Sequence, residues 1–206
     1  MNFQPGNLHH VYNQGNNKQV IFDTQEDYLT FTRFTRKYLL PFIDIIAWCL
    51  MPNHFHFMLY ADQRSNEIIQ QGGNNIDVIT NGIRKLLSGY ARMHNNKYNR
   101  TGSLFRPKTK SKCLTDIAFD AIIKKKYKAE EYYSACFHYI HQNPLRAGLV
   151  KQLEDWEYSS FKDYAGLRNG SLCNKELATK LCLYNSSEFV EISYQQIPID
   201  FVNVLK

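Results

Sequence analysis

The sequence predicts an α+β fold, a ferredoxin-like sandwich with an antiparallel sheet of about four to five strands, helices on one face and a small helical C-terminal extension. Strand and helix patterns follow the order β-α-β-β-α-β-α, and the two central strands are joined so closely that they must be antiparallel neighbours. The 206 residues, 44% of them hydrophobic, suit one domain with a sizeable core. The strand and helix pattern is lost after about Ser171, so we expect a domain over residues 1–170 and a helical extension over residues 171–206. Small helices are expected in the extension around residues 175–183 and 187–195.

The pattern opens with a strand and a helix. Residues 9–13 and 19–22 alternate as one strand that a glycine-containing loop interrupts. A helix follows, which residues 23–24 can cap and whose aromatic residues are spaced for one apolar face. It is expected to run to about Leu40, because Pro41 ends it.

Two strands come next. Residues 42–50 form a dense apolar run that is typical of a central strand. Pro52 and Asn53 make a turn into a second strand over residues 54–60.

The second half of the domain is predicted as loop, helix, strand and helix. Residues 61–75 are polar and read as a loop, and a helix with one apolar face starts near residue 76. Residues 104–114 look extended, and residues 130–143 form a helix that stops at Pro144.

Composition places limits on the function. A net charge of +6 and a pI of about 9.0 permit a polyanionic partner without proving one. No run of about 18 apolar residues occurs, and no secretory leader is evident, so we expect a soluble, cytoplasmic protein without a membrane partner. Scattered cysteines without a C-x-x-C pair are typical of reduced thiols in such a compartment: Cys49, Cys113, Cys136, Cys173 and Cys182.

His54 and His56 are the first candidates for chemistry. On a strand they point to the same face, and Phe55 points to the other. Two imidazoles on a rigid element can bind a metal ion, but such a pair in a strand more often serves packing, so the rest of a site must come from elsewhere in the chain.

Tyr139 and Asn143 offer that complement. They are four residues apart on the predicted helix and therefore share one face. Two imidazoles, a carboxamide oxygen and a phenol suit a hard divalent metal such as Mg²⁺ or Mn²⁺ beside a nucleophile. Zinc is disfavoured, because no third histidine, cysteine or carboxylate stands at a usual zinc spacing. His138 and His141 form a competing pair, but they lie on other faces of the helix.

A basic segment offers a surface for nucleic acid. Arg106, Lys108, Lys110 and Lys112 alternate with other residues, and on a strand they would line one face about 6.8 Å apart. An edge strand that lysines guard against aggregation explains the pattern equally well, and Pro107 fits an edge. The later aromatic residues can stack on bases, although packing is the simpler explanation: Trp156, Tyr158 and Phe161.

Two motifs carry a family resemblance. The first is His54-Phe-His56 after Met51-Pro-Asn, and the second is Tyr139-Ile-His-Gln-Asn-Pro-Leu-Arg-Ala-Gly-Leu-Val150. In this order they resemble the IS200-like single-tyrosine transposases of the HUH endonuclease superfamily, and most of all their REP-associated branch. Further similarity, in three shorter stretches, extends the resemblance over about residues 8–170: His10 to Gly15, Ser103 to Phe105 and Trp156 to Tyr164.

The resemblance implies the chemistry of the site. His54, His56 and Asn143 would hold a divalent metal, Mg²⁺ or Mn²⁺, and Tyr139 would attack a DNA phosphate to form a 5′-phosphotyrosine link. Gln14 departs from the pattern, because the family commonly has arginine there. The departure removes an expected DNA contact but leaves the chemistry intact.

The implied partner is single-stranded DNA with a hairpin, at a repeat or a transposon end. Asn13 and Arg146 lie in or beside the matching motifs and are expected to bind DNA together with the basic segment. Classical members are dimers with composite sites, whereas the REP-associated branch resembles monomers, so both a monomer and a homodimer fit.

The leading prediction is a metal-dependent single-stranded DNA endonuclease and strand transferase that acts in DNA transposition. A non-catalytic, domesticated regulator that binds DNA repeats is the alternative, and it would need the basic surfaces but no intact site. In a third interpretation, a metal hydrolase acts through bound water and Tyr139 only orients the substrate.

Overall fold

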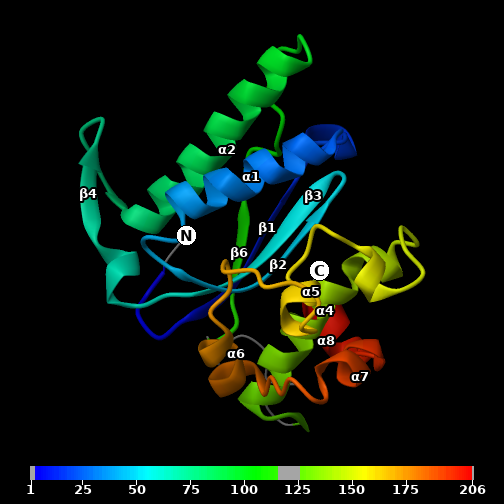
Figure 1. Ribbon diagram of the computed structural model, residues 1–206. Helices are drawn as coiled ribbons and strands as arrows, with labels where there is room; N and C mark the ends of the chain where they lie inside the picture. The colour runs from blue at the N-terminus through cyan, green and yellow to red at the C-terminus, as the bar shows by residue number, and fades with distance from the viewer. Residues whose placement is uncertain (1–2, 116–125, 206) are drawn as a thin grey trace.

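A computed structural model describes residues 3–115 and 126–205. Four strands form an antiparallel sheet in the order β2-β3-β1-β6 (Figure 1). Their bounds are Leu8–Gln14 for β1, Asp44–Met51 for β2, His54–Tyr60 for β3 and Lys110–Cys113 for β6. The register sets Tyr12 of β1 opposite both His56 of β3 and Lys110 of β6. The α+β architecture with an antiparallel sheet of four strands is as predicted.

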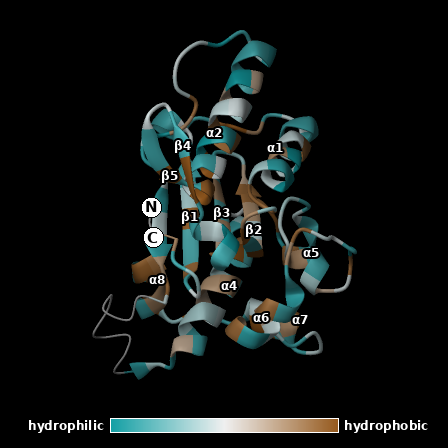
Figure 2. Ribbon diagram, turned by 90° about the vertical axis from the view of Figure 1, so that its left-hand side faces the viewer, coloured by the Kyte–Doolittle hydropathy of each residue, from teal (hydrophilic) through white to brown (hydrophobic). Residues whose placement is uncertain are grey.

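Helices cover both faces of this sheet, so the prediction of helices on one face is wrong. Helices α1 (Gln25–Tyr38) and α2 (Val78–Lys97) lie on one side, and α4 (Ala129–Arg146) crosses the other (Figure 1). Nearly every residue of β2 is buried, and its alternate side chains belong to two separate cores. A strand that is apolar on both faces needs a cover on both faces. In Figure 2, β2 is largely brown and the outer end of α2 is largely teal.

Small helices follow α4 and pack against it. The helices are α5 (Phe161–Tyr164), α6 (Lys175–Cys182), α7 (Phe189–Tyr194) and α8 (Ile199–Leu205). Buried residues of α6, α7 and α8 share one core with α4, among them Cys182, Phe189 and Phe201. The helical extension was predicted, except for α8. Among the described residues, no helix has both the length and the apolar character that a membrane crossing requires.

The segment between α4 and α6 covers the outer edge of β2. Backbone hydrogen bonds join Leu50 N to Tyr158 O at 2.8 Å and Ser160 N to Trp48 O at 2.9 Å. The Tyr158 ring stacks on Tyr28 of α1 with centroids 3.6 Å apart, and Phe161 is fully buried. These aromatic side chains therefore pack the domain, and the strand edge is protected from pairing with another chain.

Local structure differs from the predictions in two further regions. Residues 61–75, expected as a loop, contain strand β4 (Ile68–Gln71), which forms a hairpin with β5 (Asn74–Asp77). Gly72 and Gly73 make its turn with positive φ, a conformation that glycine adopts without strain. Residues 19–22 are not a strand, because they bond to the turn after β2: Ile21 N donates to Pro52 O at 2.8 Å.

Helix α4 passes through Pro144 instead of stopping there as predicted. Helix α4 ends at Arg146, two residues later. Proline lacks only the N–H that would bond to Ile140, and Ala147 N still donates to Asn143 O at 3.0 Å. The helix therefore loses one hydrogen bond in its last turn and keeps its end.

Candidate active site

Strand β3 presents both candidate histidines toward α4. The His54 and His56 rings lie on the same face, with centroids 5.0 Å apart. Phe55 points to the opposite face and packs 5.2 Å from the Phe31 ring of α1. The alternation of side chains along β3 thus places Phe55 in the core under α1 and directs both histidines to the side that α4 covers.

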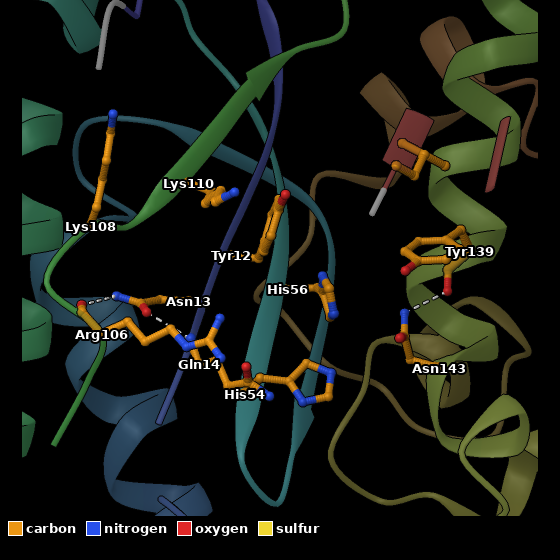
Figure 3. A pocket seen from close by; sticks show the side chains of 11 residues that line it. Tyr12, Asn13, Gln14, His54, His56, Arg106, Lys108, Lys110, Tyr139 and Asn143 are labelled. Carbon is orange, nitrogen blue, oxygen red and sulfur yellow. Dashed lines mark hydrogen bonds between the residues drawn. The ribbon is translucent and has the colours of Figure 1, made fainter. Parts of the chain in front are cut away.

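Helix α4 brings Tyr139 and Asn143 to the same place (Figure 3). The Tyr139 ring stands edge-on to His56 with centroids 6.0 Å apart. Asn143 Nδ2 donates to the Tyr139 carbonyl at 2.8 Å, which leaves Oδ1 available as a ligand atom. His54, His56, Tyr139 and Asn143 all line one cavity of about 290 Å³. Two segments that are far apart in the sequence therefore meet in one site.

Hydrogen bonds orient both histidine rings. Asn53 Oδ1 lies 2.6 Å from His54 Nδ1, and because an amide oxygen only accepts, the proton is on Nδ1 and the Nε2 lone pair is free. His56 Nδ1 lies 2.8 Å from His10 Nε2. When His56 supplies the shared proton, its Nε2 is also free to bind a cation. The sequence motif contains His10 but does not predict this contact. A histidine on the strand that pairs with β3 is the feature that could have suggested it.

Burial keeps the histidines neutral and the phenol protonated. Burial lowers the pKa of His54 to about 4 and that of His56 well below its ordinary value, with His10 and His54 adding to the second shift. Neutral imidazole is the form that binds metal ions. Burial also raises the pKa of Tyr139, and the positive charge of Arg146 opposes this rise. The guanidinium of Arg146 lies 5.7 Å from the Tyr139 ring centre.

The described residues do not supply a usual zinc ligand set. Within residues 3–115 and 126–205, no group of three or more His, Cys, Asp or Glu side chains is placed to hold a metal ion. Two neutral imidazoles and an amide oxygen leave coordination positions for water and phosphate oxygens, as Mg²⁺ and Mn²⁺ require. Binding of either ion at this site stays a prediction.

Three of the four predicted cations reach the cavity. Arg106, Lys108 and Lys110 line it, whereas Lys112 donates to the Val204 carbonyl of α8. In Figure 3 the Arg106 side chain runs toward His54, and Lys108 points away from it.

The predicted strand with four cations on one face is wrong, because only residues 110–113 form a strand. Arg106 N bonds to Gln14 O at 2.9 Å, Pro107 has no N–H to donate, and the Asn13 amide holds the segment that follows. Its Nδ2 donates to Arg106 O at 3.2 Å and to Thr109 Oγ1 at 3.0 Å. The segment before β6 therefore leaves the ladder and curves along the cavity.

The remaining DNA-binding candidates differ in what their side chains already contact. Asn13 is buried, and its Oδ1 accepts from Gln14 N at 2.7 Å. Both the oxygen and the nitrogen of its amide are therefore already in hydrogen bonds within the protein. Arg146 is exposed beside Tyr139, and Gln14 lines the cavity. DNA contacts by Asn13 and Arg146 stay predictions.

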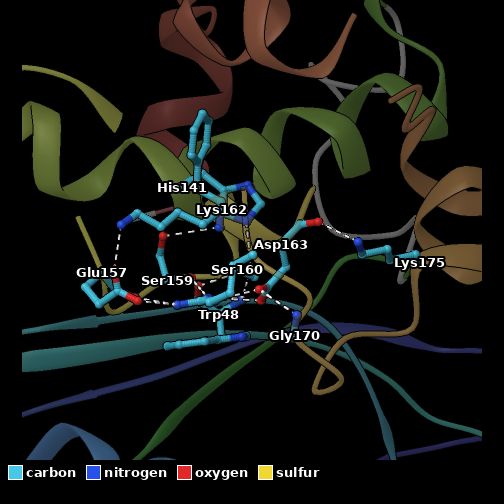
Figure 4. Close-up of polar contacts among 11 residues, drawn as sticks. Trp48, His141, Glu157, Ser159, Ser160, Lys162, Asp163, Gly170 and Lys175 are labelled. Atoms are coloured by element: carbon cyan, nitrogen blue, oxygen red, sulfur yellow. Dashed lines mark hydrogen bonds and ion pairs between the residues drawn. The ribbon is translucent and has the colours of Figure 1, made fainter. Parts of the chain in front are cut away.

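The buried Ser160 links α4 to strand β2 of the sheet (Figure 4). The Nε2 atom of His141 lies 2.7 Å from Ser160 Oγ, and the same hydroxyl accepts from Trp48 N of β2 at 3.0 Å. On another face of α4, His138 Nδ1 lies 2.9 Å from Ser193 Oγ. These two histidines therefore join α4 to β2 through Ser160 and to α7 through Ser193.

An ion network ties down the covering segment beside them. Arg168 binds Asp163 through Nε at 2.6 Å and Nη2 at 3.0 Å, and its guanidinium lies 5.6 Å from the Trp48 ring centre. Such a two-pronged pair fixes geometry as well as charge. The segment that covers β2, to which α4 is joined through His141 and Ser160, is thus fixed against β2.

Comparisons with known proteins show a relationship at the level of the fold. No family model matches the sequence, and no curated protein matches it. Among solved structures, a REP-associated tyrosine transposase bound to a REP hairpin superposes with a TM-score of 0.52 at 17% sequence identity. The match covers 84% of this chain and 94% of that one. At this identity the likeness shows a shared fold.

Proposed function

We propose that this protein is a metal-dependent endonuclease and strand transferase for single-stranded DNA, of the tyrosine transposase type, which cleaves near a hairpin. One observation carries the proposal: the Tyr139 phenol faces the same cavity as His54, His56 and Asn143. The fold is shared with a transposase that was solved with a DNA hairpin, which supports the choice of DNA as the substrate.

The reaction is a transfer of a phosphoryl group to Tyr139. The phenol oxygen attacks the phosphorus of the scissile phosphate, the bond to the 3′ oxygen breaks, and a 5′-phosphotyrosine link forms. The phenol proton leaves, and the departing 3′ oxygen takes up a proton. Attack by a 3′-hydroxyl of another end reverses the step and joins the strands. A divalent cation held by His54, His56 and Asn143 would polarise the phosphate and stabilise the leaving oxygen.

The surroundings of Tyr139 explain why the phenol needs help. A phenol has a reference pKa of about 10, and burial raises the pKa of Tyr139 further. The guanidinium of Arg146 lies 5.7 Å from its ring centre, and its charge favours the phenolate. Arg146 is therefore proposed to assist the nucleophile as well as to contact phosphate.

Arg106 is proposed to supply the positive charge that Gln14 lacks. Both residues line the cavity, and they are joined through Arg106 N and Gln14 O at 2.9 Å. A guanidinium can bind a phosphate in a two-pronged manner. The substitution at position 14 is thus compatible with an intact phosphate site.

The test is covalent capture. Labelled oligonucleotides with hairpins of varied sequence and unpaired flanks are incubated with protein and Mn²⁺, and adducts are resolved on denaturing gels. We expect an adduct that Tyr139→Phe abolishes and that Tyr133→Phe, a matched change six residues earlier on α4, preserves. Absence of any adduct, with a folded and metal-loaded protein, would refute the proposal. Hairpin binding that is independent of metal, with no cleavage, would favour a regulatory DNA-binding protein. Free cleaved ends without an adduct would favour a hydrolase that acts through water.

A further inference from the structure

A second cavity adjoins the candidate active site. It has a volume of about 520 Å³, within the range of about 300–1,000 Å³ that is common for small-ligand sites. It lies between α2 and residues 102–109, and we call it the α2 groove. Asn13, Arg106 and Lys108 line both the groove and the catalytic cavity. The two cavities therefore share a wall, and a chain that leaves one can enter the other across it.

The groove combines an apolar floor with a basic rim. The α2 side contributes Ile83, Leu87 and Ala91, and the opposite side contributes Leu104 and Phe105. Three cations stand among the lining residues, and none of the described lining residues is acidic: the cations are Arg84, Arg106 and Lys108. All three are exposed. An apolar floor with a basic rim suits a chain that carries negative charges along one edge and flat apolar groups along the other.

One buried polar atom in the groove lacks a hydrogen-bond partner in the described part of the chain. Thr80 Oγ1, near the N-terminus of α2, is buried and has no hydrogen-bond partner among the described residues. The other hydroxyls at hand are engaged, since Ser103 Oγ donates to Phe105 O at 2.6 Å and Thr109 Oγ1 accepts from Asn13. A buried hydroxyl without a partner destabilises a protein by about 1–3 kcal/mol. A ligand with hydrogen-bonding edges would satisfy it.

We propose that the α2 groove holds unpaired nucleotides of the DNA strand whose scissile phosphate lies in the catalytic cavity. This inference rests on the proposed function. Phosphates would follow Arg106, Lys108 and Arg84, and bases would lie on the apolar floor, with a base edge at Thr80. Duplex DNA keeps its bases stacked inside and would leave the floor uncovered. The groove thus selects an unpaired flank of the hairpin, and the stem itself stays outside.

The experiment measures DNA binding without cleavage. All proteins carry Tyr139→Phe, no metal is added, and the probe is a fluorescein-labelled 12-nucleotide unpaired strand of mixed sequence, compared with the same strand in a blunt duplex by fluorescence anisotropy. Arg84→Ala removes a rim cation, Arg84→Lys retains its charge, and Ala91→Leu fills the floor. Arg92→Ala is the matched control, because Arg92 is exposed on the same helix but does not line the groove.

We expect Arg84→Ala to weaken binding of the unpaired strand about fivefold and to reduce the salt dependence by about one counterion. Arg84→Lys should restore most of the affinity, and Ala91→Leu should weaken binding of the unpaired strand more than that of the duplex. Affinities of Arg84→Ala and Ala91→Leu equal to that of Arg92→Ala would overturn the groove proposal and leave the proposed function standing. A parent protein that binds neither DNA would instead count against the proposed function itself.

Discussion

The Nε2 atom of His10 lies 2.8 Å from the Nδ1 atom of His56, and both rings are buried. The two strands that carry them are neighbours in the sheet. A histidine that binds a metal through one nitrogen usually donates its other N–H to an acceptor, which fixes the ring and its tautomer. If His56 binds a metal as proposed, a second imidazole would take the place of the usual carboxylate or carbonyl. His10 is thus positioned to govern whether the Nε2 atom of His56 is free to bind a cation.

Removal of His10 should weaken metal binding. His10→Ala is expected to lower the affinity for Mn²⁺ about 10–100-fold, the range found when such a supporting partner is lost. His10→Gln, whose side-chain oxygen can accept the same proton, should retain more affinity. Calorimetric titration with Mn²⁺ measures both. His9→Ala serves as control, because His9 is also buried but contacts Phe3 and Ser111. Equal affinities of His10→Ala and His9→Ala would contradict the assignment.

Asn143 should contribute an oxygen ligand. Asn143→Ala is expected to lower both Mn²⁺ affinity and the rate of adduct formation, whereas Asn143→Asp keeps an oxygen at the same place, adds a negative charge and should bind Mn²⁺ at least as tightly. The Nδ2 bond to Tyr139 O supplements a helical bond, so thermal unfolding should change little. Wild-type Mn²⁺ affinity in Asn143→Ala would show that the amide is not a ligand.

Replacing Arg106 and replacing Lys112 should affect DNA affinity differently, although their sequence spacing would place both on one face of a strand. Arg106 lines the cavity, and Lys112 bonds to the Val204 carbonyl. Arg106→Ala should weaken binding of a hairpin with an unpaired flank and lower the salt slope by about one. Lys112→Ala should leave the slope unchanged. Salt-dependent anisotropy titrations provide the comparison, and a matching loss in Lys112→Ala would speak against the curved path of this segment.

Ser160 should contribute to stability through α4. In Ser160→Ala, His141 Nε2 and Trp48 N lose their shared partner inside the core. A buried polar group without a partner destabilises by about 1–3 kcal/mol, so the urea midpoint should fall by a corresponding amount. Ser187→Ala, at an exposed serine, is the control. A midpoint for Ser160→Ala that matches the control would mean that water replaces the hydroxyl.

Asp27 should make stability depend on pH in the acid range. Burial alone raises the pKa of this carboxyl, but hydrogen bonds from Lys97, Tyr98 and Thr24 outweigh it and lower the pKa to about 2. The unfolded chain, with an Asp pKa of about 3.9, then binds more protons than the folded one between these values. The stabilisation is complete above about pH 5 and is lost as the pH falls toward 2, in total about 2 kcal/mol.

Urea unfolding at pH 7 and pH 3 measures this effect. Asp27→Asn should be less stable at pH 7 and should lose stability less steeply on acidification than the wild type. Asp155→Asn, which removes an exposed carboxylate, should follow the wild-type curve. An unchanged acid dependence in Asp27→Asn would assign the effect to other groups.

The sequence by itself determined the order of the four sheet strands and of the three long helices, the common face of His54 and His56, and the common face of Tyr139 and Asn143. These features follow from the periods of the strand and the helix, which are local properties of the chain. The meeting of the two pairs was inferred from a resemblance, because no local pattern measures the distance between β3 and α4.

Only the tertiary structure decided what surrounds the pairs. Helices cover both faces of the sheet because β2 is apolar on both. Its continuous apolar run is compatible with burial on both faces, but the run does not say which helix covers which face. His10 acquires its role because β1 pairs with β3 and brings its ring to His56. Arg106 leaves the strand face because Asn13 holds the segment that follows it. Each of these depends on a contact between residues that are distant in sequence, and such contacts are set by the packing of the whole chain.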